Sequence, residues 1–231
     1  MHTVNVKSRG YQKIKGATSA FNFDFRGKIV LDIGSSTGGF TQYALDRGAT
    51  KVIAVEKGTN QMQIPLRFDP RVELHEKTDI FDLGVQEEPF EGISERGSAR
   101  VSARAPWQTA PWDADDPKGR RARATRPEKV LSCIPDVVIA DVSFISLTKI
   151  LEHVKLLKNA DFLVMLKPQF EADKDQLNKG VVKNEKLRRE IIKNFEQWLK
   201  ANNFIIVNKR DNELKGKTGN RERFYHLKLA K

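Results

Sequence analysis

The sequence predicts an α/β fold with a mostly parallel, seven-stranded sheet and an antiparallel hairpin at one edge. Three observations lead to this prediction. Short apolar runs alternate with segments of helical periodicity, which favours parallel strands joined by helices. A glycine-rich stretch directly follows the first of these runs. The last two runs lie beyond the final helical segment, as expected of an antiparallel pair at the edge of a sheet.

The elements follow in order along 231 residues, a length that suits one domain. The segments expected as strands are 28–33, 51–56, 72–75, 136–141, 161–167, 204–208 and 223–229. Those expected as helices are 39–47, which Gly48 ends, 147–157 and the amphipathic segment 185–201. We expect a basic helical segment over residues 1–27, ahead of the main domain at 28–231.

Residues 92–132 do not fit this alternation. The segment is rich in Ala, Arg, Pro, Ser and Gly and has hardly any aliphatic residue to bury, which favours a flexible insertion without a function of its own. It also carries nine Lys/Arg against five acidic residues, with Trp107 and Trp112 among them. The alternative is therefore a segment that stacks on bases or binds phosphates.

The composition argues against several classes of protein. No stretch approaches the ~18 uninterrupted apolar residues of a membrane helix, and the first residues lack the apolar core of a signal peptide. We therefore expect a cytoplasmic protein that does not act at a membrane. Cys133 is the only cysteine, and the four histidines have no ligand spacing, so neither a disulfide nor a metal site is expected.

The positive charge is concentrated at the two ends of the chain. The formal net charge is +11, of which residues 1–28 contribute +5 and residues 179–231 contribute +9, while the middle of the chain is slightly acidic. If the fold brings the ends together, they form one basic surface able to neutralise the phosphates of a nucleic acid. A basic face that is merely solvated is the alternative.

The glycine-rich loop is the strongest local signal for a ligand. It lies between a buried strand and a helix, where a Rossmann-like fold brings the backbone close to a cofactor. The pattern G-x-G-x-x-G of dinucleotide enzymes has a glycine in its middle, but Ser36 stands there. This favours a cofactor without phosphates, such as S-adenosyl-L-methionine. The loop residues expected to bind it are Asp32, Gly34, Ser35, Ser36, Thr37, Gly38, Gly39 and Phe40.

The strand ends beside the loop supply the other expected cofactor contacts. Asp32 is placed to meet an ammonium group, and Glu56 to accept hydrogen bonds from ribose hydroxyls. Asp79 and Ile80 are placed to flank the adenine. A tight turn that serves only helix packing is the alternative for the loop.

Six segments, taken together, resemble the TlyA (haemolysin-A-like) family of ribosomal RNA 2′-O-methyltransferases, which have an FtsJ-like methyltransferase domain. They are Ser8-Arg9-Gly10 with Lys13, LDIGSSTGGF from Leu31, DVSFISL from Asp141, LKPQFE from Leu166, GVV from Gly180 and GNRE from Gly219. They span most of the chain outside 92–132 and follow the order of the family. The resemblance implies a Rossmann-like methyltransferase that uses S-adenosyl-L-methionine and acts on ribosomal RNA or a ribosomal subunit.

The resemblance also implies a catalytic set, Lys13, Asp141, Lys167 and Glu222. Lys167 would orient the ribose hydroxyl and take its proton, which requires a neutral amine. Asp141 would stabilise positive charge near the methyl group and contact the cofactor, and Glu222 would hold a lysine in position. The chain's own pattern places Asp141 and Lys167 at the carboxyl ends of the two strands next to the cofactor strand. The alternatives are a surface role for Lys13 and an ordinary ion pair between Lys167 and Glu222.

The chain departs from the family pattern in its amino-terminal RNA-binding (S4) domain, which is expected to be missing, and in the insertion. Glu56 stands for the commoner aspartate, and the stretch with Asn212 and Glu213 lacks an expected serine-proline. Other functions remain open: a catalytically inactive ribosome-associated protein, a membrane-active haemolysin, and a nicotinamide enzyme, which Ser36 disfavours.

Overall fold

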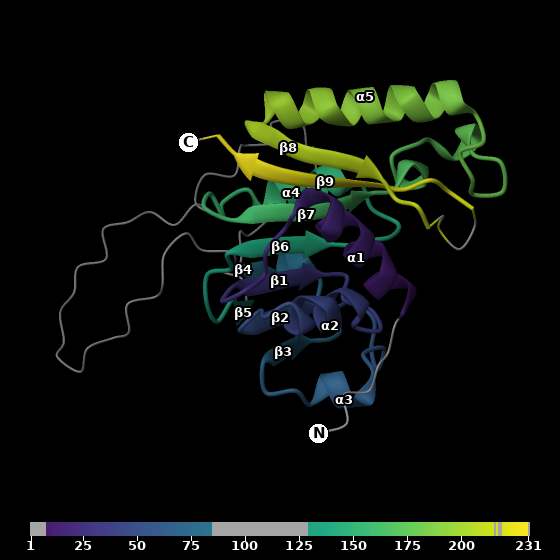
Figure 1. Ribbon diagram of the computed structural model, residues 1–231. Coiled ribbons are helices and arrows are strands. Elements are labelled where there is room, and N and C mark those ends of the chain that lie inside the picture. Colours follow the sequence, from purple (N-terminus) through teal and green to yellow (C-terminus); the bar gives the residue numbers. More distant parts are fainter. Residues whose placement is uncertain (1–7, 85–128, 215, 217–218, 231) are drawn as a thin grey trace, which may run out of the picture.

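The computed structural model describes residues 8–84, 129–214, 216 and 219–230. A seven-stranded sheet forms its centre, in the order β3-β2-β1-β6-β7-β9-β8 (Figure 1). The strands are β1 (Ile29–Ile33), β2 (Lys51–Val55), β3 (Val72–His75), β6 (Val137–Ala140), β7 (Asp161–Leu166), β8 (Phe204–Asp211) and β9 (Arg223–Leu229).

The pairing confirms the predicted mostly parallel sheet. β1 pairs in parallel with β2 and β6, β2 with β3, and β6 with β7. β9 runs antiparallel to both β7 and β8, so an antiparallel pair closes this edge. As a consequence, the end of β7 and the beginning of β9 lie on the side of the sheet where the parallel strands β1 and β6 have their carboxyl ends. This side is the carboxyl edge of the sheet.

Helices cover both faces of the sheet, giving three layers (Figure 1). The helices α1 (Arg9–Phe21), α2 (Gly39–Asp46) and α3 (Ile64–Arg67) contribute to one apolar core. The helices α4 (Leu147–Val154) and α5 (Glu185–Ala201) contribute to the other. Alternate strand residues supply the two cores: Val52 and Ala54 point to the first, Ile53 and Val55 to the second. Burial on both faces explains why the strands are nearly continuous apolar runs.

Several short elements were not expected from the sequence. These are α3, the 3₁₀ turns Ile80–Asp82, Pro168–Phe170 and Lys174–Gln176, and a small parallel pair of β4 (Leu83–Gly84) with β5 (Lys129–Val130). The expected insertion at 92–132 lies outside the described residues except for its last four. Of these four residues, 129–130 form β5.

A buried arginine fixes α5 to the edge where β9 begins. The Arg188 side chain is 5 % exposed, and its Nη2 lies 2.8 Å from Asp211 Oδ1. The same carboxylate oxygen accepts a hydrogen bond from Arg223 Nε at 2.5 Å. One aspartate thus joins α5, β8 and the first residue of β9. This network holds in place the chain immediately after Glu222.

Candidate functional site

Asp141 and Lys167 meet at the carboxyl edge of the parallel strands. Asp141 directly follows β6, and Lys167 directly follows β7. β6 is the neighbour of the cofactor strand β1, as expected, but β7 lies one strand further away. Lys167 Nζ is 2.6 Å from Asp141 Oδ1 and donates a hydrogen bond to Ser143 Oγ at 3.0 Å. An ammonium is therefore held beside a carboxylate at the edge where α/β sheets bind ligands.

Lys13 and Glu222 form a second ion pair at this edge. Lys13 Nζ lies 2.6 Å from Glu222 Oε2, and the two side chains are only 10 % and 3 % exposed. Glu222 precedes β9, whose first residue, Arg223, is paired with Leu166 at the end of β7. Glu222 is therefore close to Lys167 along the sheet edge. Its partner is nevertheless Lys13, so the alternative of an ion pair between Lys167 and Glu222 is wrong.

Both pairs join segments that are far apart in the sequence. Because buried charges are costly unless they are paired, each ion pair favours the close approach of the two segments that it joins. Lys13 is therefore more than a solvated surface lysine: burial and pairing hold its amine at the edge of the sheet.

The glycine loop passes directly under this edge. Gly34 has a φ of +80°, and a Cβ built there would lie 3.1 Å from the carbonyl oxygen of Asp141. Only a residue without a side chain fits this approach easily. The loop is therefore in contact with the segment that carries Asp141, which supports the predicted neighbourhood of cofactor loop and carboxylate.

A second close approach ties the loop to α1. A Cβ on Gly39 would lie 2.2 Å from Ser8 Oγ and 2.9 Å from Tyr11 N. Ser8 caps α1 by accepting a hydrogen bond from Tyr11 N. Phe40, expected at the cofactor, is 3 % exposed and stacks on Phe224 inside the core, with ring centroids 6.1 Å apart. The Ser8-Arg9-Gly10 segment thus packs the helix that carries Lys13 onto the helix that begins at the loop.

Asp32 lies fully buried beneath the loop. Its Oδ2 accepts a hydrogen bond from Thr41 Oγ1 at 2.6 Å, whereas Oδ1 has no hydrogen-bond partner among the described residues. Burial raises the pKa of Asp32 to about 7; the Thr41 hydrogen bond opposes this rise, and the negative charge of Asp141 adds to it. An unpartnered carboxylate oxygen under a glycine loop suits a ligand with an ammonium group.

The remaining expected cofactor residues lie around the loop. Glu56 accepts hydrogen bonds from Ser36 N at 2.9 Å and from Gly58 N at 2.7 Å, so its carboxylate holds the loop itself. Asp79 caps the turn Ile80–Asp82 and pairs with Lys57 at 3.0 Å. The other expected residues differ in exposure: Ser35, Gly38 and Ile80 are buried, and Ser36 and Thr37 are exposed.

Some side chains at the site were not singled out from the sequence. Ser143 contacts Lys167, and Asn220 joins two of the quoted segments by accepting from Val182 N at 3.0 Å and donating to Gly180 O at 2.9 Å. Both lie inside segments that carry the family resemblance. Only this position in the sequence indicated that they could belong to the site, because their partners depend on the tertiary fold.

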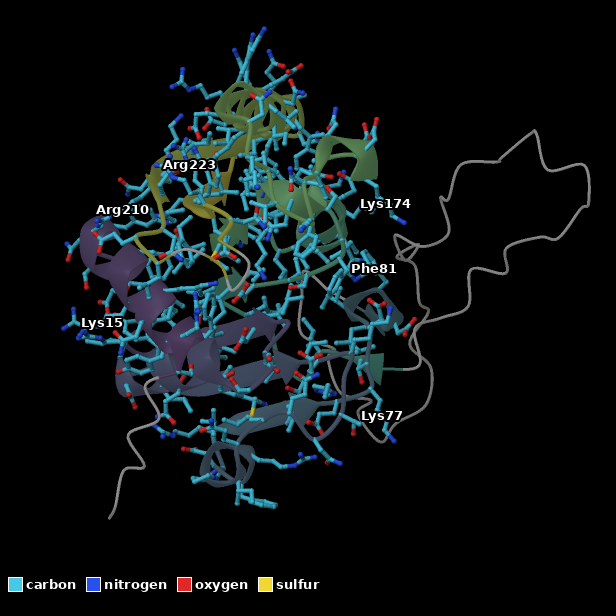
Figure 2. All side chains as sticks on the ribbon, turned by 90° about the vertical axis from the view of Figure 1, so that its right-hand side faces the viewer. Lys15, Lys77, Phe81, Lys174, Arg210 and Arg223 are labelled. Atoms are coloured by element: carbon cyan, nitrogen blue, oxygen red, sulfur yellow. The ribbon has the colours of Figure 1, made fainter. Side chains whose placement is uncertain are left out.

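A cavity of about 290 Å³ lies beside the Lys13–Glu222 pair, between α1 and the chain that follows β8. Lys15 and Arg210, which line it, are on the same side of the molecule (Figure 2). Asn212, also in the lining, donates its backbone N–H to Glu222 O at 2.8 Å. The cavity therefore adjoins the segment that carries Glu222, and no residue of the glycine loop lines it.

The described residues contain no group of three or more His, Cys, Asp or Glu side chains placed to hold a metal ion. Over the same residues, no helix is long and apolar enough to cross a membrane.

Comparison with known proteins agrees with this geometry. Residues 6–229 match the family of FtsJ-like methyltransferases. The Brachyspira hyodysenteriae protein named Hemolysin A is 34 % identical, and the match covers 96 % of this chain and 78 % of that protein. The 16S/23S rRNA (cytidine-2′-O)-methyltransferase TlyA of Mycobacterium tuberculosis is 32 % identical, with 96 % and 68 % covered.

Solved structures show the same fold. A crystal structure from Lactococcus lactis, provisionally named a hemolysin, superimposes with a TM-score of 0.73 at 29 % identity, covering 97 % of this chain and 89 % of that one. A crystal structure from Listeria monocytogenes, provisionally named an S-adenosylmethionine-dependent methyltransferase, shares the fold alone. It superimposes with a TM-score of 0.56 at 15 % identity, covering 95 % of this chain and all of that one. The predicted Rossmann-like methyltransferase fold is thereby confirmed. The chain belongs to the FtsJ-like methyltransferases and, among them, to the TlyA/hemolysin A group.

Proposed function

We propose that this protein transfers a methyl group from S-adenosyl-L-methionine to a ribose 2′-hydroxyl of ribosomal RNA. The observation that carries the proposal is that two ion pairs, Lys167–Asp141 and Lys13–Glu222, lie at the carboxyl edge of the sheet. Each has 2.6 Å between its charged atoms. The relatives named as rRNA (cytidine-2′-O)-methyltransferases support the substrate class. A ribosomal substrate would place the protein in the cytoplasm.

The residues around the glycine loop fit the cofactor. The loop from Gly34 to Gly39 would hold the amino-acid tail, and the unpartnered Oδ1 of Asp32 would accept from its ammonium group. Glu56 would accept from the ribose hydroxyls, and Asp79 with Ile80 would border the adenine. The sulfonium of bound S-adenosyl-L-methionine supplies an electrophilic methyl group. Gly34 packs against the Asp141 backbone, which puts the loop beside the proposed catalytic pair.

The charged side chains would act on the hydroxyl that attacks this methyl group. Lys167 Nζ would act as a neutral amine, after one of its own protons has passed to solvent. It would then hold the 2′-oxygen in line and receive the hydroxyl proton, while the new C–O bond forms and the C–S bond breaks. Asp141 would keep Lys167 in place and oppose positive charge near the transferred carbon. Glu222 would fix Lys13, and because that pair is neutral overall, Lys13 adds a donor without adding net charge.

The test is methyl transfer from labelled cofactor to isolated ribosomal subunits, followed by mapping of 2′-O-methylated nucleotides. Wild-type protein should label ribose. We expect Asp141→Ala and Lys167→Ala each to lower kcat/KM at least ~100-fold, the usual size of a lost acid–base group. Lys155→Ala, which removes an exposed ion pair with Glu152 at the far end of α4, is the matched control and should keep wild-type activity.

Label on a base or on a protein would overturn the ribose assignment. Full activity of Lys167→Ala would overturn the assigned mechanism. Binding of S-adenosyl-L-methionine without transfer to either subunit would favour a ribosome-associated protein that has lost its activity.

A further inference from the structure

Two loops carry the Asp141–Lys167 pair, and neither is part of the sheet at that point. The β6–β7 ladder ends at the pair Ala140–Val164. Asp141 begins the loop that leads to α4, and Lys167 begins the loop that leads away from β7. Asp141 N still donates a hydrogen bond to Ile33 O at 3.2 Å. Beyond these first residues, the course of the two loops depends on how they are fixed to each other.

Glu171 joins the far ends of these loops. Its Oε2 accepts a hydrogen bond from Ser146 Oγ at 2.6 Å, and its Oε1 accepts from Leu147 N at 2.8 Å. Ser146 is the N-cap of α4, and Leu147 is the first residue of that helix. The first N–H groups of a helix lack partners within it and favour a negative charge. Glu171 is half-buried, and this burial raises its pKa.

The contacts close a ring through both loops. At one end, Lys167 Nζ contacts Asp141 and Ser143. In the middle, the rings of Phe144 and Phe170 lie 5.1 Å apart. At the other end is Glu171 with Ser146 and Leu147. The contact between Phe144 and Phe170 is weakly held, because Phe144 is 92 % exposed and has a φ of +63°. The hydrogen bonds of the half-buried Glu171 carboxylate are therefore the stronger link between the two loops.

We infer that Glu171 is a positioning residue for the Lys167–Asp141 pair and acts through the start of α4. The inference rests on the proposed function, since it assigns Glu171 to the same site. Without the carboxylate, the loop from Asp141 to Ser146 loses two hydrogen bonds to the loop that begins at Lys167. Displacement of a reacting group by about 1 Å can lower a rate ~100-fold, so a modest movement of this loop is enough to matter.

If Glu171 only capped α4, its substitution would change stability but not turnover. Loss of a cap lowers stability by roughly 0.5–2 kcal/mol but has no reason to change turnover. Asn184 offers the matched control, because its side chain caps α5 by accepting from Lys186 N at 2.9 Å and Leu187 N at 3.2 Å. Asn184→Ala removes two hydrogen bonds at a helix start but none of the contacts that join the two loops near Lys167.

The experiment compares Glu171→Ala, Glu171→Gln, Ser146→Ala and Asn184→Ala in the methyl-transfer assay, with thermal unfolding of each variant. We expect Glu171→Ala to lower kcat ~10- to 100-fold, with the KM for S-adenosyl-L-methionine within about threefold of wild type. Glu171→Gln keeps an acceptor for Leu147 N and should recover most of the rate. Ser146→Ala should fall between them, and it serves as the second probe should Glu171→Ala fail to fold.

A second measurement does not depend on activity. In lysine-labelled protein, the ¹⁵Nζ signal of Lys167, assigned with Lys167→Arg, reports its pairing with Asp141. We expect Glu171→Ala to move this signal toward its position in Asp141→Asn, and Glu171→Gln and Asn184→Ala to leave it unmoved.

The inference is overturned if Glu171→Ala keeps wild-type kcat, if Glu171→Gln is as impaired as Glu171→Ala, or if Asn184→Ala loses as much kcat. If the wild type methylates no ribosomal RNA, the proposed function fails by itself. The Lys167 signal then decides the inference alone, and an unchanged signal in Glu171→Ala would refute it.

Discussion

Asp32 combines two properties that oppose each other: it is fully buried, and its proposed role requires a negative charge. With its pKa raised from 3.8 to about 7, the folded protein binds a proton that the unfolded chain has already lost above pH 4. The free energy of unfolding should therefore fall as the pH rises from 4 to 7, by up to about 4 kcal/mol for a shift of this size. The negative charge of ionised Asp32 therefore lowers the free energy of unfolding, and an ammonium group of a bound ligand would offset this loss.

Asp32→Asn should flatten this dependence. Denaturant unfolding between pH 5 and pH 8 should show a smaller loss of stability in the variant than in wild type, because the titrating group is gone. Calorimetry should show weaker binding of S-adenosyl-L-methionine to the variant than to wild type at pH 8, and a smaller difference at pH 5, where Asp32 is largely neutral. In wild type, the affinity should increase as the pH rises through about 7 and Asp32 ionises.

Thr41→Val is the matched control, since it removes the hydrogen bond that stabilises the ionised form of Asp32. It should move the wild-type pH profile to higher pH without abolishing it. Parallel unfolding profiles for wild type and Asp32→Asn would show that Asp32 does not titrate in this range.

At the scale of single residues, the sequence predicts a role where a local pattern forces a conclusion. Asp141 ends the apolar run VVIA, where a carboxylate must find a partner or face a cavity, and Lys167 is that partner. Ser143 and Glu171 were not predicted, although they lie in the same segments. Their side chains act across two loops whose contact no periodicity reveals.

At the scale of elements, α1 is positioned through the glycine loop. Gly39 and Ser8 meet where α1 and α2 begin, and Thr18 Oγ1 and Tyr43 Oη share a hydrogen bond of 2.6 Å further along the two helices. Because α1 carries Lys13 toward Glu222, its docking on α2 sets the position of one of the two charged pairs.

Gly39→Ala should therefore impair activity through α1. Its Cβ would lie 2.2 Å from Ser8 Oγ, so the start of α1 must move. We expect a loss of stability of about 1–3 kcal/mol from overpacking. The fall in kcat should be ~10- to 100-fold because Lys13 moves with the helix. Unfolding and methyl-transfer measurements on the same preparation separate the two effects.

Gly16→Ala provides the comparison within α1, because no atom lies within 4 Å of the Cβ it would add. This variant should gain up to ~1 kcal/mol from helix propensity and keep its activity. Wild-type kcat in Gly39→Ala would show that the position of α1 does not depend on this contact.

Element prediction was accurate for long, periodic segments and failed for short ones. The central strands β1, β2, β6 and β7 were found because they are nearly continuously buried, and the helix 185–201 because it is strongly amphipathic. The four-residue α3 and the two-residue β4 and β5 are too short to show a period. β8 extends to Asp211, beyond the expected residue 208, because pairing with β9 continues through Asp211–Arg223.

At the scale of the whole molecule, the two basic ends of the chain meet. The contact of Lys13 with Glu222 joins α1 to the chain before β9, which meets the condition set for a shared basic surface. In Figure 2, Lys15 and Arg210 lie on one side of the molecule and Lys174 lies on the other. Lys15 and Arg210 belong to α1 and β8, so only the fold brings these two cations to the same side.

This arrangement predicts that RNA binding depends on salt and on position along α5. Lys186 lies in the first turn of α5, near the edge that carries the site, whereas Lys200 lies in its last turn, at the opposite edge; both are exposed. Lys186→Glu should weaken binding to ribosomal RNA and reduce the slope of log Kd against log salt by roughly 1 or more, because at least one phosphate contact is lost. Lys200→Glu makes the same change of charge on the same helix and should leave the slope nearly unchanged. The measurement is filter binding or fluorescence anisotropy between 50 and 200 mM salt, a range over which such contacts weaken strongly.

Equal effects of the two variants would mean that the net charge attracts RNA without a defined surface. A difference would locate the RNA at the end of α5 that lies near the edge carrying the Lys167–Asp141 pair.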